Sequence, residues 1–336
     1  MFMINCLTRQ YPIVNWQIPE SVRNKKEANP MKKVLALVLA LALVMAMSAA
    51  AFADGDKLGY TCMDGTNPFF VALEGAIREV VEAHGDTLIS LDPQNSNEKQ
   101  LSQVEDLISQ GIKVLFVNPV DRDGIIAALD KVKEAGIPMF GFDTEVADMS
   151  YLVTYAGSDN YNAGYVCGLD LVEKCPEGGE VIVLDSPTMQ SVVDRTNGFL
   201  DVLKDHPEFE VVVTLDSMGN QQLGNENATD ALTAHPNAVC IFGGNDPTAL
   251  GAAAAIDAVG SKALLYGVDG SPDVKALIAE GRATGTGAQS PISIGKTIAE
   301  KYYEWKDGAE LEDRYPIPTF MINSDNIADY NNGGWQ

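Results

Sequence analysis

The stretch AVCIFGGNDPTALGAAAAIDAVGSKALLYGVDGSPD, residues 238–273, contains two apolar runs separated by an alanine-rich segment. Short apolar runs that flank a segment of helical length predict a strand, a helix and a second strand. A polar residue ends each predicted strand: Asn245 follows the first and Asp269 closes the second. In open parallel sheets, ligands bind beyond the carboxyl ends of the strands, so these two residues are candidates for a binding site.

An earlier stretch, VLFVNPVDRDGIIAALDKVKEAGIPMFGFDT at residues 114–144, repeats this pattern. Its strand-end residues, Asn118 and Asp143, are 25 positions apart, whereas Asn245 and Asp269 are 24 apart. Each Asn has an alternative role as the N-cap of the following helix, where Asn is favoured. The matched spacing favours two similar lobes whose Asn/Asp pairs face each other.

The rest of the chain after residue 56 alternates apolar runs with amphipathic segments. The pattern predicts strands at 57–62, 87–91, 114–117, 138–142, 181–185, 210–215, 239–242, 263–268 and 283–288, and helices that include 69–84, 98–110 and 192–205. Several strands are apolar throughout rather than alternating, which is typical of parallel sheets covered by helices on both faces. We therefore expect an α/β fold with two doubly wound, Rossmann-like lobes.

Composition and charge exclude some classes of protein. The chain has 336 residues, 46% of them hydrophobic, which suits a globular protein of two domains. Its net charge is −24, and binding to a phosphate backbone requires clustered Lys and Arg, so we expect no nucleic-acid partner.

The segment 31–53 has the features of a secretory signal peptide. Met-Lys-Lys at 31–33 precedes an apolar run of 14 residues, 34–47, and small residues that end in Ala-Phe-Ala at 51–53. The alternative, a membrane anchor, needs about 20 apolar residues. No Cys follows the run, so we expect no lipid anchor and an exported protein, in the periplasm or another extracytoplasmic space, that begins at Asp54. Residues 1–30 are interpreted as a mis-assigned upstream segment or a long n-region.

The cysteines and histidines indicate neither a metal site nor a catalytic site. Cys62, Cys167, Cys175 and Cys240 are predicted to be packing residues, because their spacing fits no zinc pattern. The three histidines, His84, His206 and His235, are expected at helix ends, where they complement the helix dipole. G-x-G-x-x-G, the Walker pattern, G-x-S-x-G and H-E-x-x-H are all absent. We therefore expect no cofactor and no enzyme activity.

Three further sites contribute candidate ligand contacts. Asn67 and Pro68 are predicted to begin a helix as N-cap and first residue. Of the adjacent Phe69 and Phe70, at most one is expected to point into the core, which leaves the other as an apolar surface for a flat ligand. Arg195 is expected in the first turn of its helix, and its guanidinium donates several hydrogen bonds in a fixed geometry. Gln289 follows the predicted strand 283–288 and is a further strand-end polar residue.

Taken in order, several motifs resemble one family of proteins. They are NPFF at 67–70, VNPVD at 117–121, R-x-x-G-F at 195–199, TAHP at 233–236, GGNDPTALGA at 243–252, GVDGSPD at 267–273 and AQSP at 288–291. Over residues 57–322 the chain is similar to the periplasmic sugar-binding proteins of the ribose-binding type, which are related to the effector lobes of lac-type repressors. The export signal and the acidic charge argue against a repressor.

The resemblance implies a type I periplasmic binding fold that serves an ABC importer as its solute receptor. Two lobes, 56–157 with 290–318 and 158–289 with 319–336, would be joined by a three-stranded hinge, and the expected lobe crossings lie near 157–159, 289 and 317–319. The implied sugar contacts are Asn67, Phe69, Phe70, Asn118, Asp143, Arg195, Asn245, Asp269 and Gln289, with the phenylalanines stacking on the sugar ring. We expect a monomer whose partners are a monosaccharide or polyol and a membrane permease. A receptor for chemotaxis or signalling is the alternative.

Two departures from the family pattern bear on the ligand. Ribose binders usually have Arg after the first strand-end Asp, but this chain has Thr144. They also have an aromatic residue in the loop that here contains Met218. Both departures argue against ribose and leave a hexose, an inositol or another polyol open.

Overall fold

The computed structural model describes residues 31, 34, 55–330 and 333–336. Nearly all of the predicted signal peptide and upstream segment lies outside these residues, so both remain predictions. Residues 55–336 form one compact unit. None of the described helices is both long enough and apolar enough to cross a lipid bilayer.

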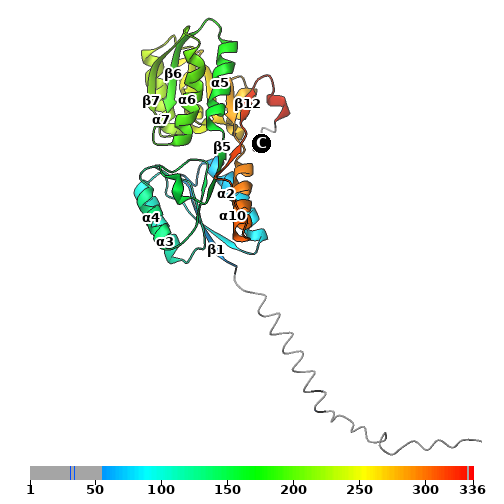
Figure 1. Ribbon diagram of the computed structural model, residues 1–336. Helices are drawn as coiled ribbons and strands as arrows, with labels where there is room; N and C mark the ends of the chain where they lie inside the picture. Colours follow the sequence, from blue (N-terminus) through cyan, green and yellow to red (C-terminus); the bar gives the residue numbers. More distant parts are fainter. Residues whose placement is uncertain (1–30, 32–33, 35–54, 331–332) are drawn as a thin grey trace, which may run out of the picture. The chain divides into compact units, whose positions relative to one another are not determined.

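The first sheet of this unit has six strands, all parallel (Figure 1). In order across the sheet they are β11 (Arg314–Ile317), β5 (Thr154–Ser158), β4 (Met139–Phe142), β3 (Leu115–Val117), β1 (Lys57–Thr61) and β2 (Thr87–Leu91). The helices α2 (Pro68–Ala83) and α10 (Pro291–Lys306) cover one face, and α3 (Asn97–Ser109) and α4 (Ile126–Glu134) cover the other. Strand β3 shows why these strands are apolar throughout: Phe116 packs in the core under α2 and α10, whereas Leu115 and Val117 pack under α3 and α4.

The second sheet has five parallel strands and one antiparallel edge strand. In order they are β12 (Phe320–Asn323), β10 (Gly285–Ala288), β9 (Leu264–Asp269), β8 (Cys240–Gly243), β6 (Gly179–Asp185) and β7 (Phe209–Asp216). One face is covered by α5 (Asn160–Lys174) and α6 (Gln190–Lys204), and the other by α7 (Gln221–Ala234), α8 (Asp246–Val259) and α9 (Pro272–Ala279). Strand β12 pairs antiparallel to β10.

The α/β fold with two doubly wound sheets is therefore confirmed. Each predicted strand is present within two residues of its expected ends, and the chain passes between the sheets after β5, after β10 and between β11 and β12. Three strands at these passages, β5, β11 and β12, were not predicted. They are only four or five residues long, and β11 contains Pro316, which is tolerated in a strand at the edge of a sheet. The exact lobe boundaries remain a prediction.

Candidate functional site

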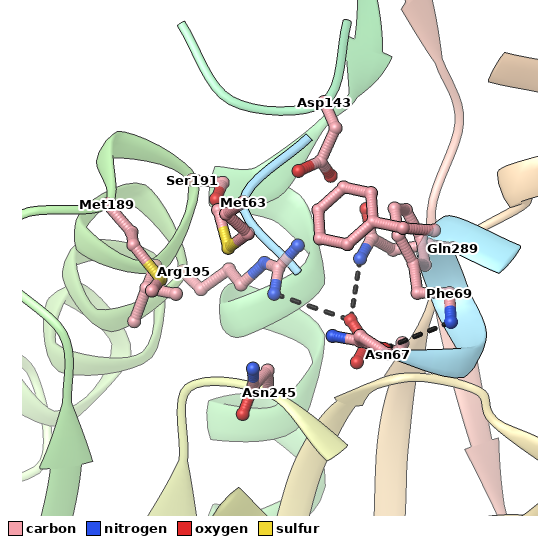
Figure 2. A pocket seen from close by; sticks show the side chains of 12 residues that line it. Met63, Asn67, Phe69, Asp143, Met189, Ser191, Arg195, Asn245 and Gln289 are labelled. Atoms are coloured by element: carbon pink, nitrogen blue, oxygen red, sulfur yellow. Dashed lines mark hydrogen bonds and ion pairs between the residues drawn. The ribbon is translucent and has the colours of Figure 1, made fainter. Parts of the chain in front are cut away.

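One cavity gathers most of the residues that the sequence singled out. It encloses about 300 Å³ when the open space at its mouth is counted. Its lining residues are Met63, Asn67, Phe69, Phe70, Asp143, Met189, Ser191, Val192, Arg195, Asn245, Asp269 and Gln289 (Figure 2). They follow strands of both sheets, so the cavity lies between the two lobes. Eight of the nine predicted ligand contacts line it, and Asn118 does not.

Asp269, at the end of β9, is the centre of a buried hydrogen-bond network. Arg195 donates from Nη1 to its Oδ1 at 3.4 Å, and Gln289 donates from Nε2 to the same oxygen at 2.7 Å. The backbone N–H of Asp246 donates to Oδ2 at 3.2 Å. Figure 2 shows the Arg195 and Gln289 side chains converging beside the cavity. The network holds a strand-end carboxylate in place at the cavity wall.

Arg195 differs from its prediction in its position along the helix. Helix α6 begins at Gln190, so Arg195 lies in the second turn and not in the first. Its side chain is buried, and a buried guanidinium needs partners for its charge and donors. Besides Asp269, it bonds Asn160 Oδ1 from Nε at 2.8 Å and the carbonyl of Gly244 from Nη1 at 3.0 Å.

The Asn118 side chain supports the other strand-end carboxylate. Its Nδ2 donates to Asp143 Oδ2 at 3.1 Å, and its Oδ1 accepts from the backbone N–H of Met63 at 3.1 Å. Thr144 Oγ1 donates to the same Asp143 oxygen at 3.1 Å. Asn118 is fully buried and does not cap a helix, so in this structure it positions Asp143 from behind the cavity wall.

Asn245 caps a helix, which was the alternative role that the sequence allowed for both Asn118 and Asn245. Its Oδ1 accepts from the backbone N–H of Thr248 at 3.0 Å at the start of α8, and its Nδ2 donates to the carbonyl of Gly219 at 3.1 Å. The two strand-end Asn residues therefore act differently. Asn245 lines the cavity while it caps a helix, whereas Asn118 lies behind the wall.

Two buried acceptor atoms of the cavity wall have no hydrogen-bond partner. They are Oδ1 of Asp143 and Oε1 of Gln289. Buried polar atoms are nearly always hydrogen-bonded, so these two acceptors are placed to receive hydrogen bonds from bound water or from a ligand. The hydroxyl groups of a ligand can donate such bonds.

Burial also shifts the protonation of the cavity carboxyls. It raises the pKa of Asp143, an effect that the charge of Arg195 opposes. Burial raises the pKa of Asp269 to about 8, although Arg195 lowers it, and the nearby carboxyl of Asp246 adds to the increase. Because the shift comes mainly from desolvation, a ligand that donates hydrogen bonds to these oxygens stabilises their charged form.

Phe69 and Phe70 form an apolar wall of the cavity. Their rings meet edge to face, with centroids 5.3 Å apart and an interplanar angle of 90°. Asn67 caps α2 by accepting the backbone N–H of Phe69 at 3.0 Å, with Pro68 as first residue, which confirms the predicted helix start. The expectation that only one ring points into the core is wrong. Both rings are buried in the core under α2, and both also line the cavity.

Sequence reasoning did not identify Met63, Met189, Ser191 and Val192 as lining residues. Their positions next to strand-end motifs were the only sign of a role in the site. An apolar or hydroxyl side chain at such a position is equally typical of a protein core. Ser191 is the most informative of them. Its Oγ lies 2.8 Å from Oγ1 of Thr144, which follows the first sheet, and this hydrogen bond joins the two lobes beside the cavity.

The last four residues, 333–336, also reach the cavity wall, and we call them the C-terminal strap. The Trp335 ring packs edge to face on Phe69, with centroids 5.8 Å apart. Gln336 donates from Nε2 to the backbone carbonyl of Asp269 at 3.1 Å and to that of Gln289. The buried Lys275 donates to the carbonyl of Gly334 at 2.6 Å and to Gln336 Oε1 at 3.2 Å. The strap therefore contacts three residues of the cavity wall.

The cysteines and histidines lie as predicted. The cysteines at positions 62, 167, 175 and 240 are free, and three of them are buried. His84 and His235 are the C-terminal caps of their helices, and His206 follows α6. Among the described residues, no group of three His, Cys, Asp or Glu side chains is placed to hold a metal ion.

Comparison with known proteins identifies the family. The family described as "Periplasmic binding protein domain" matches residues 58–310. The chain belongs to this family of periplasmic binding proteins. These are sugar-transport binding proteins rather than enzymes, so the expectation of no enzyme activity is confirmed.

Curated relatives of this periplasmic binding protein are sugar-import proteins. It is 32% identical over 294 residues to the ribose import binding protein of Escherichia coli, covering 87% of this chain and 98% of that one. It is 30% identical to the D-apiose import binding protein of Actinobacillus succinogenes, covering 84% and 93%. Among solved structures, an ABC transporter solute-binding protein from Mycobacterium smegmatis with bound glycerol is 26% identical, with a TM-score of 0.77 and 82% and 96% of the chains covered. The resemblance to the ribose-binding type is confirmed.

Proposed function

We propose that this protein is the exported solute receptor of an ABC-type sugar importer. It binds a monosaccharide or a related polyol between its two lobes, closes on it and delivers it to a membrane permease. The protein functions as a monomer in the periplasm or an equivalent extracytoplasmic space. The named relatives act in import, which favours transport over the alternative role in chemotaxis or signalling.

The observation that carries this proposal is the chemistry of the cavity wall. Carboxylates from both sheets, Asp143 and Asp269, stand at the same cavity, and Asp143 retains an unpaired oxygen. Arg195 adds a guanidinium that already donates hydrogen bonds to Asp269 and to the carbonyl of Gly244, and the acidic groups beside it disfavour an anionic ligand. The Phe69 and Phe70 rings offer apolar surface for the C–H groups of a ring. A neutral, hydroxyl-rich ring meets all these groups.

Closure follows from ligand contacts to both lobes. Asp143 follows a strand of the first sheet, whereas Asp269 and Gln289 end strands of the second. A ligand shifts a conformational equilibrium only by its differential affinity for the two states. A sugar that bridges these residues binds the closed state more tightly, because the open state offers it only one lobe.

A ligand screen tests the proposed function. The melting temperature of the purified protein should rise with at least one neutral sugar or polyol from a panel of pentoses, hexoses, inositols and nucleosides, because a ligand bound only to the native state stabilises it. Calorimetry should then show that Asp269→Ala weakens binding of that compound by about 2 kcal/mol or more, since the substitution leaves buried donors unpaired.

The matched control is Asp257→Ala, which removes a partly exposed carboxylate of α8 that pairs with Arg282 on the surface. This variant should bind the sugar like the wild type. A panel in which no neutral compound raises the melting temperature would contradict the proposed function. Unchanged affinity of Asp269→Ala would remove Asp269 from the site.

A further inference from the structure

A second cavity adjoins the site and has no role in the function proposed above. It encloses about 470 Å³ including its mouth, and Asp143 and Ser191 line both cavities. Its other walls come from β5 and β11, where the chain passes between the sheets, from the loop after β4, and from helices α5 and α6. They are Glu145, Tyr155, Gly157, Ser158, Asn160, Asp194, Arg314 and Pro316.

Two buried oxygen atoms at this cavity have no hydrogen-bond partner in the structure. Ser158 is 8% exposed, and its Oγ has no hydrogen-bond partner. Asp143 is 4% exposed, and its Oδ1 is also unpaired, because Asn118 and Thr144 both donate to the other oxygen. The Tyr155 hydroxyl is committed to the backbone carbonyl of Asp143. The Ser158 hydroxyl can donate or accept and the Asp143 oxygen accepts, so a hydroxyl group that enters this cavity can form hydrogen bonds with both.

The charges at this cavity determine what kind of ligand group can bind to these oxygen atoms. Its carboxylates belong to Asp143, Glu145 and Asp194, and its cation is Arg314, which is paired with Glu145 through both guanidinium nitrogens. The excess of acidic side chains disfavours a ligand whose bound group is a phosphate or a carboxylate. A neutral group that carries hydroxyls satisfies the acceptors without introducing negative charge.

Asp143 and Ser191 line both cavities, so the two cavities share one part of their wall. Beside it, the small side chains of Thr144 and Ser191 are joined by a hydrogen bond of 2.8 Å, which is one of the polar contacts between the lobes.

We propose that the second cavity is a subsite for a hydroxylated arm of the ligand. This inference rests on the proposed sugar-binding function and narrows it: the ring occupies the first cavity, and an exocyclic hydroxymethyl or longer polyol arm extends past Asp143 toward Ser158. The preferred ligand is therefore a hexose or larger polyol rather than the pentose with the same ring. An arm ending in phosphate is excluded.

Sugar pairs that differ only in the arm test this subsite. D-allose, D-glucose and D-galactose in their pyranose forms equal D-ribose, D-xylose and L-arabinose, respectively, with a hydroxymethyl group added to the ring. For the pair whose ring the protein accepts, calorimetry should show the hexose binding about threefold to tenfold more tightly than the pentose. The corresponding hexose 6-phosphate should bind at least tenfold more weakly than the hexose.

Two variants of Ser158 locate the effect. Ser158→Val fills part of the second cavity and suits a strand, so it should remove the preference for the hexose and leave pentose affinity unchanged. Ser158→Ala removes the unpaired hydroxyl without filling the cavity. It should reduce the hexose preference in part, and it tests the proposal even if the Val variant does not fold.

The outcomes separate the two proposals. If a pentose binds but the hexose gains nothing, or if both Ser158 variants keep the wild-type hexose preference, the subsite is wrong while the sugar-binding function stands. If none of the six sugars or any other neutral polyol binds, both proposals fail. Tight binding of a hexose 6-phosphate would contradict the proposal that the subsite accepts only an uncharged arm.

Discussion

At the residue scale, the site depends on carboxyl groups that are buried before any ligand arrives. Asp269 is 4% exposed and lies close to the second buried carboxyl of Asp246, whose pKa burial also raises. Burying a charged group is costly unless it is paired, and one Arg195 guanidinium serves this cluster. The ligand-free protein is therefore expected to keep Asp269 protonated over part of the neutral pH range.

This protonation predicts how stability depends on pH. The pKa of Asp269 is raised to about 8 in the folded protein. In the unfolded chain the pKa of Asp is about 3.9, so between these values the folded protein binds a proton that the unfolded chain lacks. The contribution of Asp269 to stability is complete below about pH 4 and is lost as the pH rises toward 8.

Comparing the wild type with Asp269→Asn isolates this effect, because Asn does not titrate. The free energy of unfolding, wild type minus variant, should decrease steadily from pH 4 to pH 8 when measured by urea denaturation without ligand at constant ionic strength. A difference that stays constant over this range would show that Asp269 is ionised in the folded protein throughout.

The strand-end residues were predictable from sequence because they recur at fixed spacing after apolar runs. What the sequence did not reveal is which neighbour each residue meets. The capping role of Asn245 and the supporting role of Asn118 follow from the local backbone, although both residues stand in the same motif position. Ser191 was missed because its importance lies in a contact with Thr144, which is 47 residues away in the chain.

At the element scale, the C-terminal strap is the least expected part of the site. It follows the second sheet, yet Trp335 packs on Phe69 of α2, and the Gln336 amide bonds the ends of β9 and β10. Lys275 of α9, 1% exposed, donates hydrogen bonds to the strap at Gly334 and Gln336. These contacts fix the backbone of two residues whose side chains line the cavity.

Deleting residues 333–336 should weaken sugar binding about tenfold, which corresponds to about 1.4 kcal/mol. The deletion frees the carbonyls of Asp269 and Gln289 and one edge of the Phe69 ring, so the wall is less well positioned. Calorimetry with the sugar found in the screen measures the loss. Trp335→Phe keeps an aromatic edge on Phe69 and should lose less affinity than Trp335→Ala. Wild-type affinity of the deletion variant would mean that the strap has no part in binding.

The elements themselves were predicted well where a strand is buried on both faces. The central strands of each sheet are continuous apolar runs, and their burial on two faces requires that composition. Strands β5, β11 and β12 carry Thr, Ser, Arg, Pro or Asn, because they lie where the chain passes between sheets. These strands form because they pair with strands that are distant in the sequence, and the local sequence pattern does not show such pairing.

At the scale of the whole molecule, two side-chain hydrogen bonds join the lobes beside the cavity. Thr144 and Ser191 share a hydrogen bond of 2.8 Å, and Arg122 donates to Gln190. Both connect a loop of the first sheet with the start of α6. Ligand exchange through the cleft requires these contacts to open if the lobes move as proposed.

A disulfide between these positions tests the motion directly. The Oγ atoms of Thr144 and Ser191 are close enough that Thr144→Cys with Ser191→Cys should form a bond on oxidation. The oxidised variant should exchange ligand at least tenfold more slowly than the same variant after reduction, as measured by stopped-flow dissociation. The wild type, whose described cysteines are free, controls for the oxidant. Equal exchange rates in both redox states would show that ligand enters without separation of the lobes.

The contact between Trp335 and Phe69 has an optical consequence. The sequence contains three tryptophans, and Trp16 lies in the segment expected to be removed on export. Replacing the partly exposed Trp305 by Phe leaves a single indole in the mature chain, which touches an aromatic ring of the cavity wall. Its emission reports on the polarity of that wall, so the molecule carries a label-free fluorescent sensor for its own cargo.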